Sequence, residues 1–407
     1  MKKVIKLRLI LFISVLILIF RGNTDAANYN VHRDSFNNFG FESEDTAPAD
    51  YYKEIYDHAN SEDLIKNMPE AAKNYINFDL NSDTHINGAL QLNDLSEKFN
   101  FGFIFNIIIS LLGKLMPAVI QNFLPIVALI ILSASVYALK DSFESESFSE
   151  ILNFILIVCL SGSVFFAVRE CFYLSKNFLD EIRMYMLAMV PVMASLSTAS
   201  GNIAAAAVNS AGIYVAMNIV QIISSSVIFP ILQICYSLSL AKSLTNTVNL
   251  DGVTSYIRSI MNWIFIFIIT LLVAVLLFQN IIASSADTVV ARTVKFTMSS
   301  FVPVIGGVIS DASRTIMGSI GAVRSVTGVF GILVIVITLL PPLITIALHK
   351  FMLSLSAAFA LVLGMDRQAG FFKEMKSLLD MTLAVMISVA IVFIFSITIF
   401  IQTGTAI

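Results

Sequence analysis

The feature that most constrains this chain is a series of apolar segments that begins at about Phe101 and continues to its end. A helix needs about 20 predominantly apolar residues to cross a bilayer, and several of these segments reach that length. Others are shorter, and the stretch Ser200-Gly201-Asn202 interrupts the series, so we expect about six to eight crossings. The segments are Pro117–Leu139, Ile151–Val168, Met184–Ala199, Ile203–Leu240, Ile260–Ile282, Val329–Leu348, Phe351–Leu363 and Met381–Ile401.

The composition supports the same conclusion, since 57% of the 407 residues are hydrophobic and only 13% are charged. Soluble globular chains have about 45–50% apolar and about 25% charged residues. With half the usual charge, there is too little polar surface to coat a water-soluble body. The sequence therefore predicts an all-α fold, a polytopic α-helical membrane protein, with its membrane domain at 101–407.

The first residues have the layout of a secretory signal peptide. Its three parts are the basic residues Lys2, Lys3, Lys6 and Arg8, the apolar run Leu9–Phe20, and the cleavage-site residues Thr24-Asp25-Ala26. An apolar run of about 12 residues is too short to span a bilayer comfortably. We expect a cleaved signal peptide at 1–26, with an uncleaved signal anchor as the alternative. Either one places the following residues outside the cytoplasm.

Residues 27–100 form a polar and acidic segment. Residues 28–100 contain 14 Asp and Glu against 5 Lys and Arg, a net charge of −9. Asn28–Pro48 lacks apolar periodicity and is typical of a flexible linker. Helical spacing of apolar residues predicts two or three short amphipathic helices between Tyr51 and Lys98. The segment is either a small solvated cap outside the cytoplasm or a docking surface, with a basic partner as the natural occupant.

A weak internal repeat relates 183–283 to 295–401 at an offset of 112 residues. The equivalences pair prolines and charged residues: Pro191 with Pro303, Pro230 with Pro342, and, after three inserted residues, Asp251 with Asp366 and Arg258 with Lys373. Weak internal symmetry is the usual trace of repeats in transporter-like membrane proteins. The alternative is chance similarity between two stretches of apolar sequence.

The stretch from Ala291 to Gly331 differs from the other apolar segments because it combines helix-weakening residues with charges. The candidate determinants here are Arg292, Lys295, Pro303, Gly306, Gly307, Asp311 and Arg314. Proline and glycine interrupt a helix in lipid only where protein or water satisfies the freed backbone groups. Asp311 and Arg314 are three residues apart and can pair on one helix face. A polar re-entrant segment, a water-exposed loop and a helix-packing surface all fit this pattern.

Positive charge indicates the orientation only in part. The best candidates for the cytoplasmic face are Asp287–Arg324 and Gly364–Lys376, both rich in Lys and Arg. Both can face the cytoplasm if Val329–Leu363 is a hairpin that turns at His349-Lys350.

The motifs of the common catalytic classes are absent from the sequence. It contains no HExxH, no GxSxG and no GxxxxGK[ST] motif, and its four histidines and three cysteines are scattered singly. Nothing indicates a metal, a cofactor or a nucleic-acid partner, and we expect a protein that is not an enzyme. An intramembrane hydrolase would need a nucleophile with its base, a metal site or a carboxylate pair inside the spans.

The chain resembles the stage III sporulation protein AE family of endospore-forming bacteria in two respects. The first is its layout, a signal peptide followed by an acidic segment and a polytopic region. The second is the block RTVKF…FVPVIGGVISDA at Arg292–Ala312. The resemblance implies a location in the mother-cell membrane around the forespore. It further implies a secretion-like channel complex with the other proteins of the same operon and a forespore-side partner. The matching determinants are Lys295, Pro303, Gly306, Gly307 and Asp311; the family offers no catalytic residues.

A secondary transporter of a small solute, built on the internal repeat, is the alternative function. Such a protein would place several ionisable groups at the middle of the membrane. The sequence leaves open what is transported and whether the chain forms a homo-oligomer.

Overall fold

A computed structural model describes residues 61–75, 101–138, 146–244, 251–301 and 306–402. The predicted signal peptide at 1–26 and the predicted linker at 28–48 lie outside the described residues. Every described element is a helix. The helices are α4 (Ser61–Lys66), α5 (Glu70–Tyr75), α7 (Phe101–Ala138), α8 (Glu146–Ala199), α9 (Ile203–Ile222), the π-helix η3 (Ile223–Ile228), α10 (Phe229–Leu244), α11 (Asp251–Phe301), α12 (Gly306–Val362) and α13 (Asp366–Gln402).

Six of the described helical stretches are long and apolar enough to cross a membrane. They are Gly102–Val136, Phe154–Ala199, Ile203–Lys242, Ser255–Asp287, Val323–Val362 and Asp366–Gln402. The third stretch comprises α9, η3 and α10, which follow one another without a gap. Together these helices confirm the predicted polytopic α-helical membrane protein.

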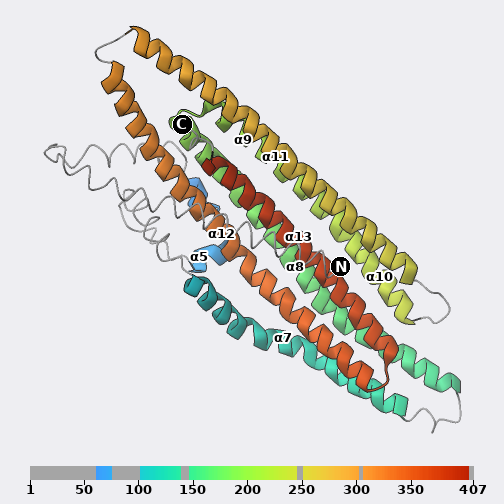
Figure 1. Cartoon of the computed structure of the whole chain (residues 1–407). Coiled ribbons are helices and arrows are strands. Elements are labelled where there is room, and N and C mark those ends of the chain that lie inside the picture. The colour runs from blue at the N-terminus through green and yellow to red at the C-terminus, as the bar shows by residue number, and fades with distance from the viewer. Residues whose placement is uncertain (1–60, 76–100, 139–145, 245–250, 302–305, 403–407) are drawn as a thin grey trace.

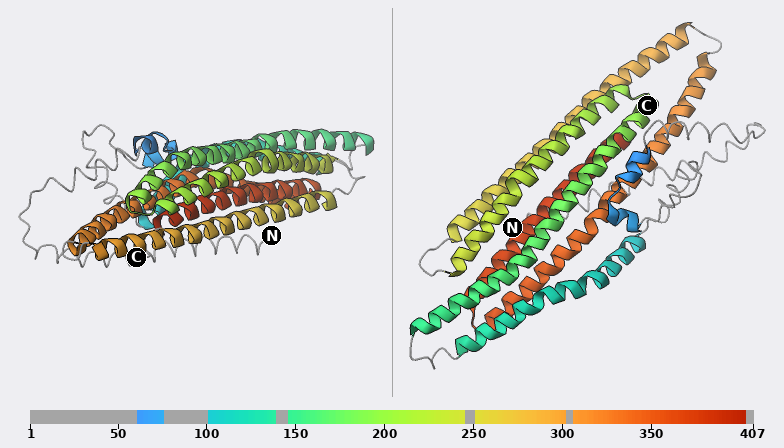
Figure 2. Two further views of the ribbon diagram at one scale, coloured as in Figure 1. Left: turned by 90° about the horizontal axis from the view of Figure 1, so that it is seen from above. Right: turned by 180° about the vertical axis from the view of Figure 1, so that it is seen from behind.

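The long helices lie side by side in one elongated bundle (Figures 1 and 2). α12 and α13 form its centre, because 72% and 67% of their apolar windows are buried, against 22% for those of α7 and α11. α12 packs most extensively against α13 and next against α8. α7 and α11 therefore form the outer sides of the bundle, and their exposed apolar side chains are suited to contact lipid.

Two tight turns reverse the chain, and each depends on a glycine. Gly201 has φ 84° between α8 and α9, and Gly364 has φ 73° between α12 and α13. Glycine adopts this left-handed conformation without the steric penalty of a Cβ. The uncertain break at Ser200-Gly201-Asn202 is thus a true turn between two spans.

The predicted hairpin at His349-Lys350 is wrong, because α12 continues through both residues to Val362. No helix breaker occurs at that position, and the chain turns only at Gly364. Arg324 and Gly364 consequently lie on opposite sides of the long apolar part of α12. The two basic stretches that we expected on the cytoplasmic face, Asp287–Arg324 and Gly364–Lys376, cannot share one side of the membrane.

The small N-terminal helices pack against the side of the bundle rather than standing apart from it. α4 contacts α8 and α5 contacts α12. Leu64, Met68 and Ala72 are 5%, 3% and 0% exposed and belong to the same apolar core as the long helices. This part of the acidic segment is docked on the chain's own membrane domain.

Glycines allow the central helices to approach closely. A Cβ added at Gly331 of α12 would lie 2.7 Å from Met189 Cε of α8 and 3.1 Å from Ile397 Cδ1 of α13. Real Cβ atoms are essentially never found as close as 2.7 Å to another heavy atom and rarely at 3.1 Å, so the two neighbouring side chains would have to move. Small residues commonly permit such contacts between membrane helices.

We predict that Gly331→Val destabilises the protein by about 1–3 kcal/mol, the usual cost of overpacking a close contact. The melting temperature of the purified protein in detergent measures the effect. Gly321→Val is the matched control, because it adds the same β-branched side chain to the same helix with no atom within 4 Å of its Cβ. Equal melting temperatures for the two variants would contradict the packing role of Gly331.

Candidate functional site: charged residues within the bundle

Three neighbouring helices contain long runs without a charged residue, at 259–286 in α11, 325–348 in α12 and 381–402 in α13. At 1.5 Å per residue, runs of 22 to 28 residues extend about 33 to 42 Å. The hydrocarbon core of a bilayer is about 30 Å thick. These runs define the apolar layer of the bundle, and charged side chains stand at both of its edges.

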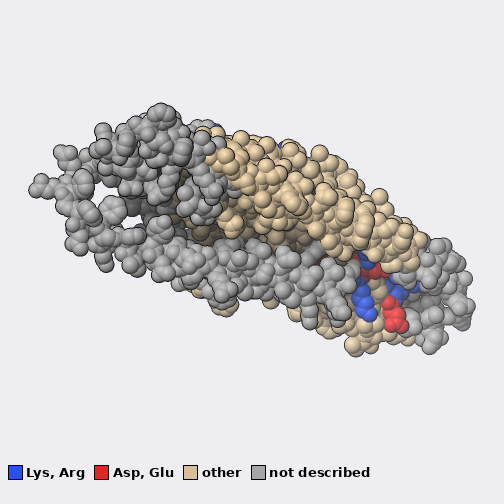
Figure 3. Space-filling model, turned by 45° about the horizontal axis from the view of Figure 1, so that its top comes forward, with Lys and Arg blue, Asp and Glu red and all other residues tan. Residues whose placement is uncertain are grey.

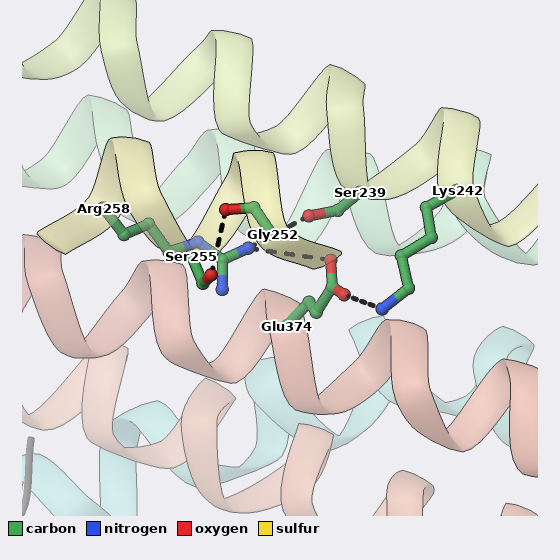
Figure 4. Close-up of polar contacts among 6 residues, drawn as sticks. All are labelled: Ser239, Lys242, Gly252, Ser255, Arg258 and Glu374. Atoms are coloured by element: carbon green, nitrogen blue, oxygen red, sulfur yellow. Dashed lines mark hydrogen bonds and ion pairs between the residues drawn. The ribbon is translucent and has the colours of Figure 1, made fainter. Parts of the chain in front are cut away.

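At one edge, two sets of charges connect α13 to its neighbours. Lys350 of α12 pairs with Asp380 of α13. Glu374 of α13 accepts a charge-assisted bond from Lys242 Nζ of α10 at 2.5 Å, and Arg258 Nη2 of α11 lies 3.6 Å from its other oxygen (Figure 4). We call Lys242, Arg258 and Glu374 the three-charge cluster. In the face shown in Figure 3, the described charged side chains gather at one end of the bundle.

At the opposite edge, two charged groups satisfy the ends of helices. Asp287 of α11 is 8% exposed, and its two carboxylate oxygens accept hydrogen bonds from Ala204 N and Ala205 N, each at 2.8 Å. These are among the first amide groups of α9, which have no partners within the helix. Arg324 is 2% exposed and donates to Ser200 Oγ at 3.1 Å and to Ile401 O at 3.4 Å, near the end of α13.

α8 departs from this pattern, because it carries charges where its neighbours carry none. α8 runs antiparallel to α12: Glu170 Oε2 lies 3.9 Å from His349 Nε2, and Met189 lies against Gly331. Residues between Glu170 and Met189 are therefore level with residues 331–349 of α12, which include most of its uncharged run. The charged stretch of α8 at that level consists of Lys176, Asp180, Glu181 and Arg183.

The charged stretch of α8 is poorly suited to face lipid. Lys176 and Glu181 are exposed, and Asp180 and Arg183 are partly exposed. An ionised side chain at the centre of a bilayer costs about 2.5–3.5 kcal/mol on insertion scales, so such residues usually face water or protein. Glu70 of α5 lies near enough to Glu181 for the two carboxylates to repel each other. This side of the bundle is consequently a polar surface at membrane depth.

The charged stretch is connected to the π-helix of the neighbouring span. Gln221, two residues before η3, donates its side-chain amide to Asp180 Oδ1 at 2.8 Å. The π-helix contains the run Ser224-Ser225-Ser226, and the Ser224 hydroxyl is buried without a hydrogen-bond partner in the part of the chain that the structure describes. Single π-helical turns often mark functional sites, because they shift a helix face locally.

The glycine-rich stretch that the sequence singled out forms a helical hairpin beyond the apolar layer. Asp287–Phe301 of α11 and Gly306–Arg324 of α12 extend past the start of α9 and the end of α13 (Figure 1). We call these two stretches the helical arm. It carries the predicted determinants Arg292, Lys295, Gly306, Gly307, Asp311 and Arg314, and Pro303 lies outside the described residues.

The remaining predicted determinants do not form one site. Pro191 lies exposed within α8, Pro230 lies exposed near the start of α10, and Pro342 is buried within α12. Each lies inside or at the beginning of a continuous helix. Among the described residues, no group of three or more His, Cys, Asp or Glu side chains could hold a metal ion.

Sequence reasoning missed the charged stretch of α8, although a signal for it was present. Ile151–Val168 and Met184–Ala199 read as two separate segments, so the charges between them read as a polar connection. However, 169–183 contains neither glycine nor proline, and nothing there ends a helix. One helix of 54 residues results.

Comparisons with known proteins give one consistent result. The family model for stage III sporulation protein AE matches residues 88–404. The chain is 22% identical over 337 residues to the stage III sporulation protein AE of Bacillus subtilis (strain 168), which covers 83% of this chain and 81% of that protein. No solved structure matches the chain.

The buried contact of Asp287 generates a prediction about stability. Asp287→Asn replaces one acceptor oxygen by an amide donor that faces another donor, and it removes a negative charge from a helix N-terminus. We expect a loss of about 1–2 kcal/mol, the range measured for helix caps. Thermal unfolding in detergent checks this, with Ser285→Ala on the same helix as a control that removes only a local bond to Ile281 O. An unchanged melting temperature for Asp287→Asn would refute the capping role.

Proposed function

The chain belongs to the stage III sporulation protein AE family, and on that premise we propose that it is a membrane component of a secretion-like channel complex between mother cell and forespore. Family membership and the six apolar helices identify a multi-pass membrane protein with a role in sporulation. The proposal adds a place in the mother-cell membrane around the forespore and a requirement in late forespore development. The protein contributes a path or a scaffold and no catalytic step.

The observation that carries the proposal is the charged stretch of α8. A helix that holds Lys176, Asp180, Glu181 and Arg183 level with the uncharged runs of α11, α12 and α13 needs water or protein on its open side. A channel complex supplies such surroundings, either as an aqueous lumen or as a neighbouring subunit. A single bundle in lipid leaves these charges facing hydrocarbon. The chain therefore acts within an assembly.

The proposed orientation follows from the six spans and the helical arm. With the signal peptide at 1–26, the acidic segment enters from the intermembrane space, with its helices α4 and α5 docked on α8 and α12. Six crossings then return the C-terminus to that side. The three-charge cluster and the basic stretch Gly364–Lys376 then face the cytoplasm, as the positive-inside rule requires, whereas the basic stretch Asp287–Arg324 lies on the other side and departs from that rule. The helical arm projects into the intermembrane space.

The helical arm and the acidic segment are the proposed contacts with partners. Other proteins of the same sporulation operon and a forespore-side membrane protein are the expected partners, together with further copies of this chain. Between its two ends the arm carries three basic residues, Arg292, Lys295 and Arg314, and one acidic residue, Asp311. This excess of positive charge suits binding to an acidic surface.

Thiol labelling tests whether the charged stretch of α8 contacts water. In a chain without its three native cysteines, we expect Lys176→Cys to react with a membrane-impermeant thiol reagent in opened membranes from sporulating cells. The control is Leu271→Cys, which is 54% exposed on the outer face of α11 at a similar level of the bundle. Lys176→Cys should react at least about tenfold faster, because a thiolate forms in water and not in lipid.

The dependence of labelling on partner proteins separates the two forms of the proposal. A rate that rises when the partners are expressed indicates an aqueous lumen, and a rate that falls indicates a covering subunit. If both cysteines react equally slowly with and without the partners, the channel proposal loses its main support.

A charge reversal tests the helical arm. We expect Lys295→Glu to weaken co-purification with the partner proteins, because it removes one positive charge and adds a negative one. Lys373→Glu is the control, since it makes the same change at an exposed position at the opposite end of the bundle. Both variants should reach the membrane in normal amounts. An equal effect of the two variants would show that net charge, and not the arm, determines the association.

A secondary transporter is the second candidate function. The contact between Asp180 and Gln221 beside the π-helix is the observation that favours it, because transporters bind solutes at interrupted helices near the middle of the membrane. Flux of a small solute driven by an ion gradient in vesicles that contain only this protein would support it. Channel function predicts no such flux.

A further inference from the structure

His349 of α12 is buried among three helices, and one of its ring nitrogens makes no hydrogen bond. The residue is 1% exposed. Its Nδ1 lies 2.8 Å from Thr345 O, and because a carbonyl oxygen can only accept, Nδ1 carries a hydrogen. Its Nε2 is buried without a hydrogen-bond partner among the described residues. Buried polar atoms in native proteins are rarely left unpaired, so this nitrogen calls for an explanation.

A carboxylate faces the unpaired nitrogen across a short gap. Glu170 Oε2 of α8 lies 3.9 Å from His349 Nε2, which is beyond hydrogen-bond distance. In the neutral ring with its hydrogen on Nδ1, Nε2 has only a lone pair, and two acceptors that face each other form no bond. A proton on Nε2 turns it into a donor. The gap can then close to about 2.7–2.9 Å, the usual length of a charge-assisted hydrogen bond.

Side chains of α7 hold both groups in place. Asn122 Nδ2 donates to Glu170 Oε2 at 3.1 Å, and the Phe123 ring packs edge-on against the His349 ring with centroids 5.8 Å apart. His349 immediately follows the uncharged run of α12, so the pair lies at the edge of the apolar layer. The side chain of Glu170 is 48% exposed, against 1% for His349. A proton from water can therefore reach the buried nitrogen along the carboxylate.

The other charged groups near His349, on its own helix and on the helices packed there, do not face Nε2. They are Lys114 of α7, Arg169 of α8, Lys350 of α12, and Lys376 and Asp380 of α13. Lys350 pairs with Asp380, and Lys376 donates to Ser354 Oγ at 3.1 Å. Lys114 and Arg169 are exposed. The charged residue Glu70 of α5 lies near Glu181, eleven residues further along α8 than Glu170.

We propose that His349 and Glu170 form a proton-binding site, in which a proton on Nε2 joins α12 to α8. With the proton bound, the Glu170 carboxylate accepts from His349 and from Asn122 and so connects α7, α8 and α12. When the proton leaves, the bond between α12 and α8 at this edge is lost. The site is at the same edge of the bundle as Lys350 and Asp380. In the orientation proposed above this edge faces the cytoplasm, and the assignment to that compartment alone rests on the proposed function.

Histidine-selective nitrogen-15 NMR of the full-length protein in detergent micelles reports the protonation of each ring. The chain has four histidines, and loss of a signal in His349→Gln identifies that of His349. At about pH 8 we expect a neutral ring with its hydrogen on Nδ1, and at about pH 5.5 a hydrogen on both nitrogens. In Glu170→Gln the ring should still be neutral at about pH 5.5, because burial disfavours a charged ring that has no carboxylate beside it.

Glu181→Gln is the matched control, since it makes the same substitution at another exposed position of α8. It should leave the protonation of His349 as in the wild-type protein. A His349 ring that stays neutral in the wild-type protein at about pH 5.5 would overturn the site. A ring that gains its second hydrogen equally in wild type and in Glu170→Gln would overturn it as well.

Thermal unfolding in detergent measures whether the proton joins the helices. The bond contributes stability at low pH and loses it as the pH rises. On acidification from about pH 8 to about pH 5.5, the melting temperature of the wild-type protein should therefore rise by roughly 2–4 °C relative to that of Glu170→Gln. At the higher pH, Glu170→Gln should be no less stable than wild type, because its amide can donate to the neutral Nε2. A loss of stability in Glu170→Gln that is equal at both pH values would show a purely structural role and overturn the proposal.

These measurements are independent of the channel proposal. The purified protein contains no partner proteins, so the titration of His349 can be found whether or not the charged stretch of α8 reacts with the thiol reagent. Failure of the thiol labelling would in turn leave the result for His349 and Glu170 unchanged.

Discussion

The structure depends on one constraint: an apolar layer contains no water to solvate charged groups. α11, α12 and α13 obey it through uncharged runs long enough to cross a bilayer, and their charges stand at the two edges. Each edge charge also connects helices. Asp287 of α11 accepts hydrogen bonds from the start of α9. Arg324 of α12 binds Ser200 in the turn before α9 and Ile401 near the end of α13. Lys350 of α12 pairs with Asp380 of α13. The side chains that delimit the layer thus also fix the register of the helices.

α8 is the exception, because it carries charged side chains within the apolar layer. The helices around it provide polar partners or cover. Asp180 is bonded to Gln221 of the adjacent span, and α4 and α5 lie on the same side of the bundle. The carboxylates of Glu70 and Glu181 repel each other, while Leu64, Met68 and Ala72 hold the small helices in place by apolar packing. Apolar packing of these residues thus places α4 against α8 and α5 against α12, beside the charged stretch of α8.

Much of the fold could be predicted because the length of an apolar segment strongly indicates a membrane-spanning helix. The positions of turns and the full lengths of helices leave weaker signals in the sequence. The all-α class followed directly from the sequence. The stretch Ser200-Gly201-Asn202 was recognised as an interruption, and the structure shows that it is a turn between two spans. The hairpin expected at His349-Lys350 failed because a His-Lys pair does not end a helix, while Gly364 does. The charged stretch of α8 was missed for the opposite reason, since polarity was taken as a break where helix propensity continued. The glycines at 328 and 331 required knowledge of their neighbours Ile401 and Met189, which no local pattern contains.

The arrangement of the helices also bears on the proposed internal repeat. α11 begins at Asp251 and α13 begins at Asp366, the two positions that the repeat equates. In Figure 1, α9 and α12 run in one direction while α11 and α13 return in the other. If the repeat is real, each unit contributes two full crossings, and two such units are parallel rather than inverted. Parallel units of this kind do not form the two inverted halves between which many transporters place a central binding site. The repeat was the sequence argument for a transporter. In the parallel arrangement it is equally compatible with a scaffold, in which the charged stretch of α8 contacts other subunits of a larger assembly.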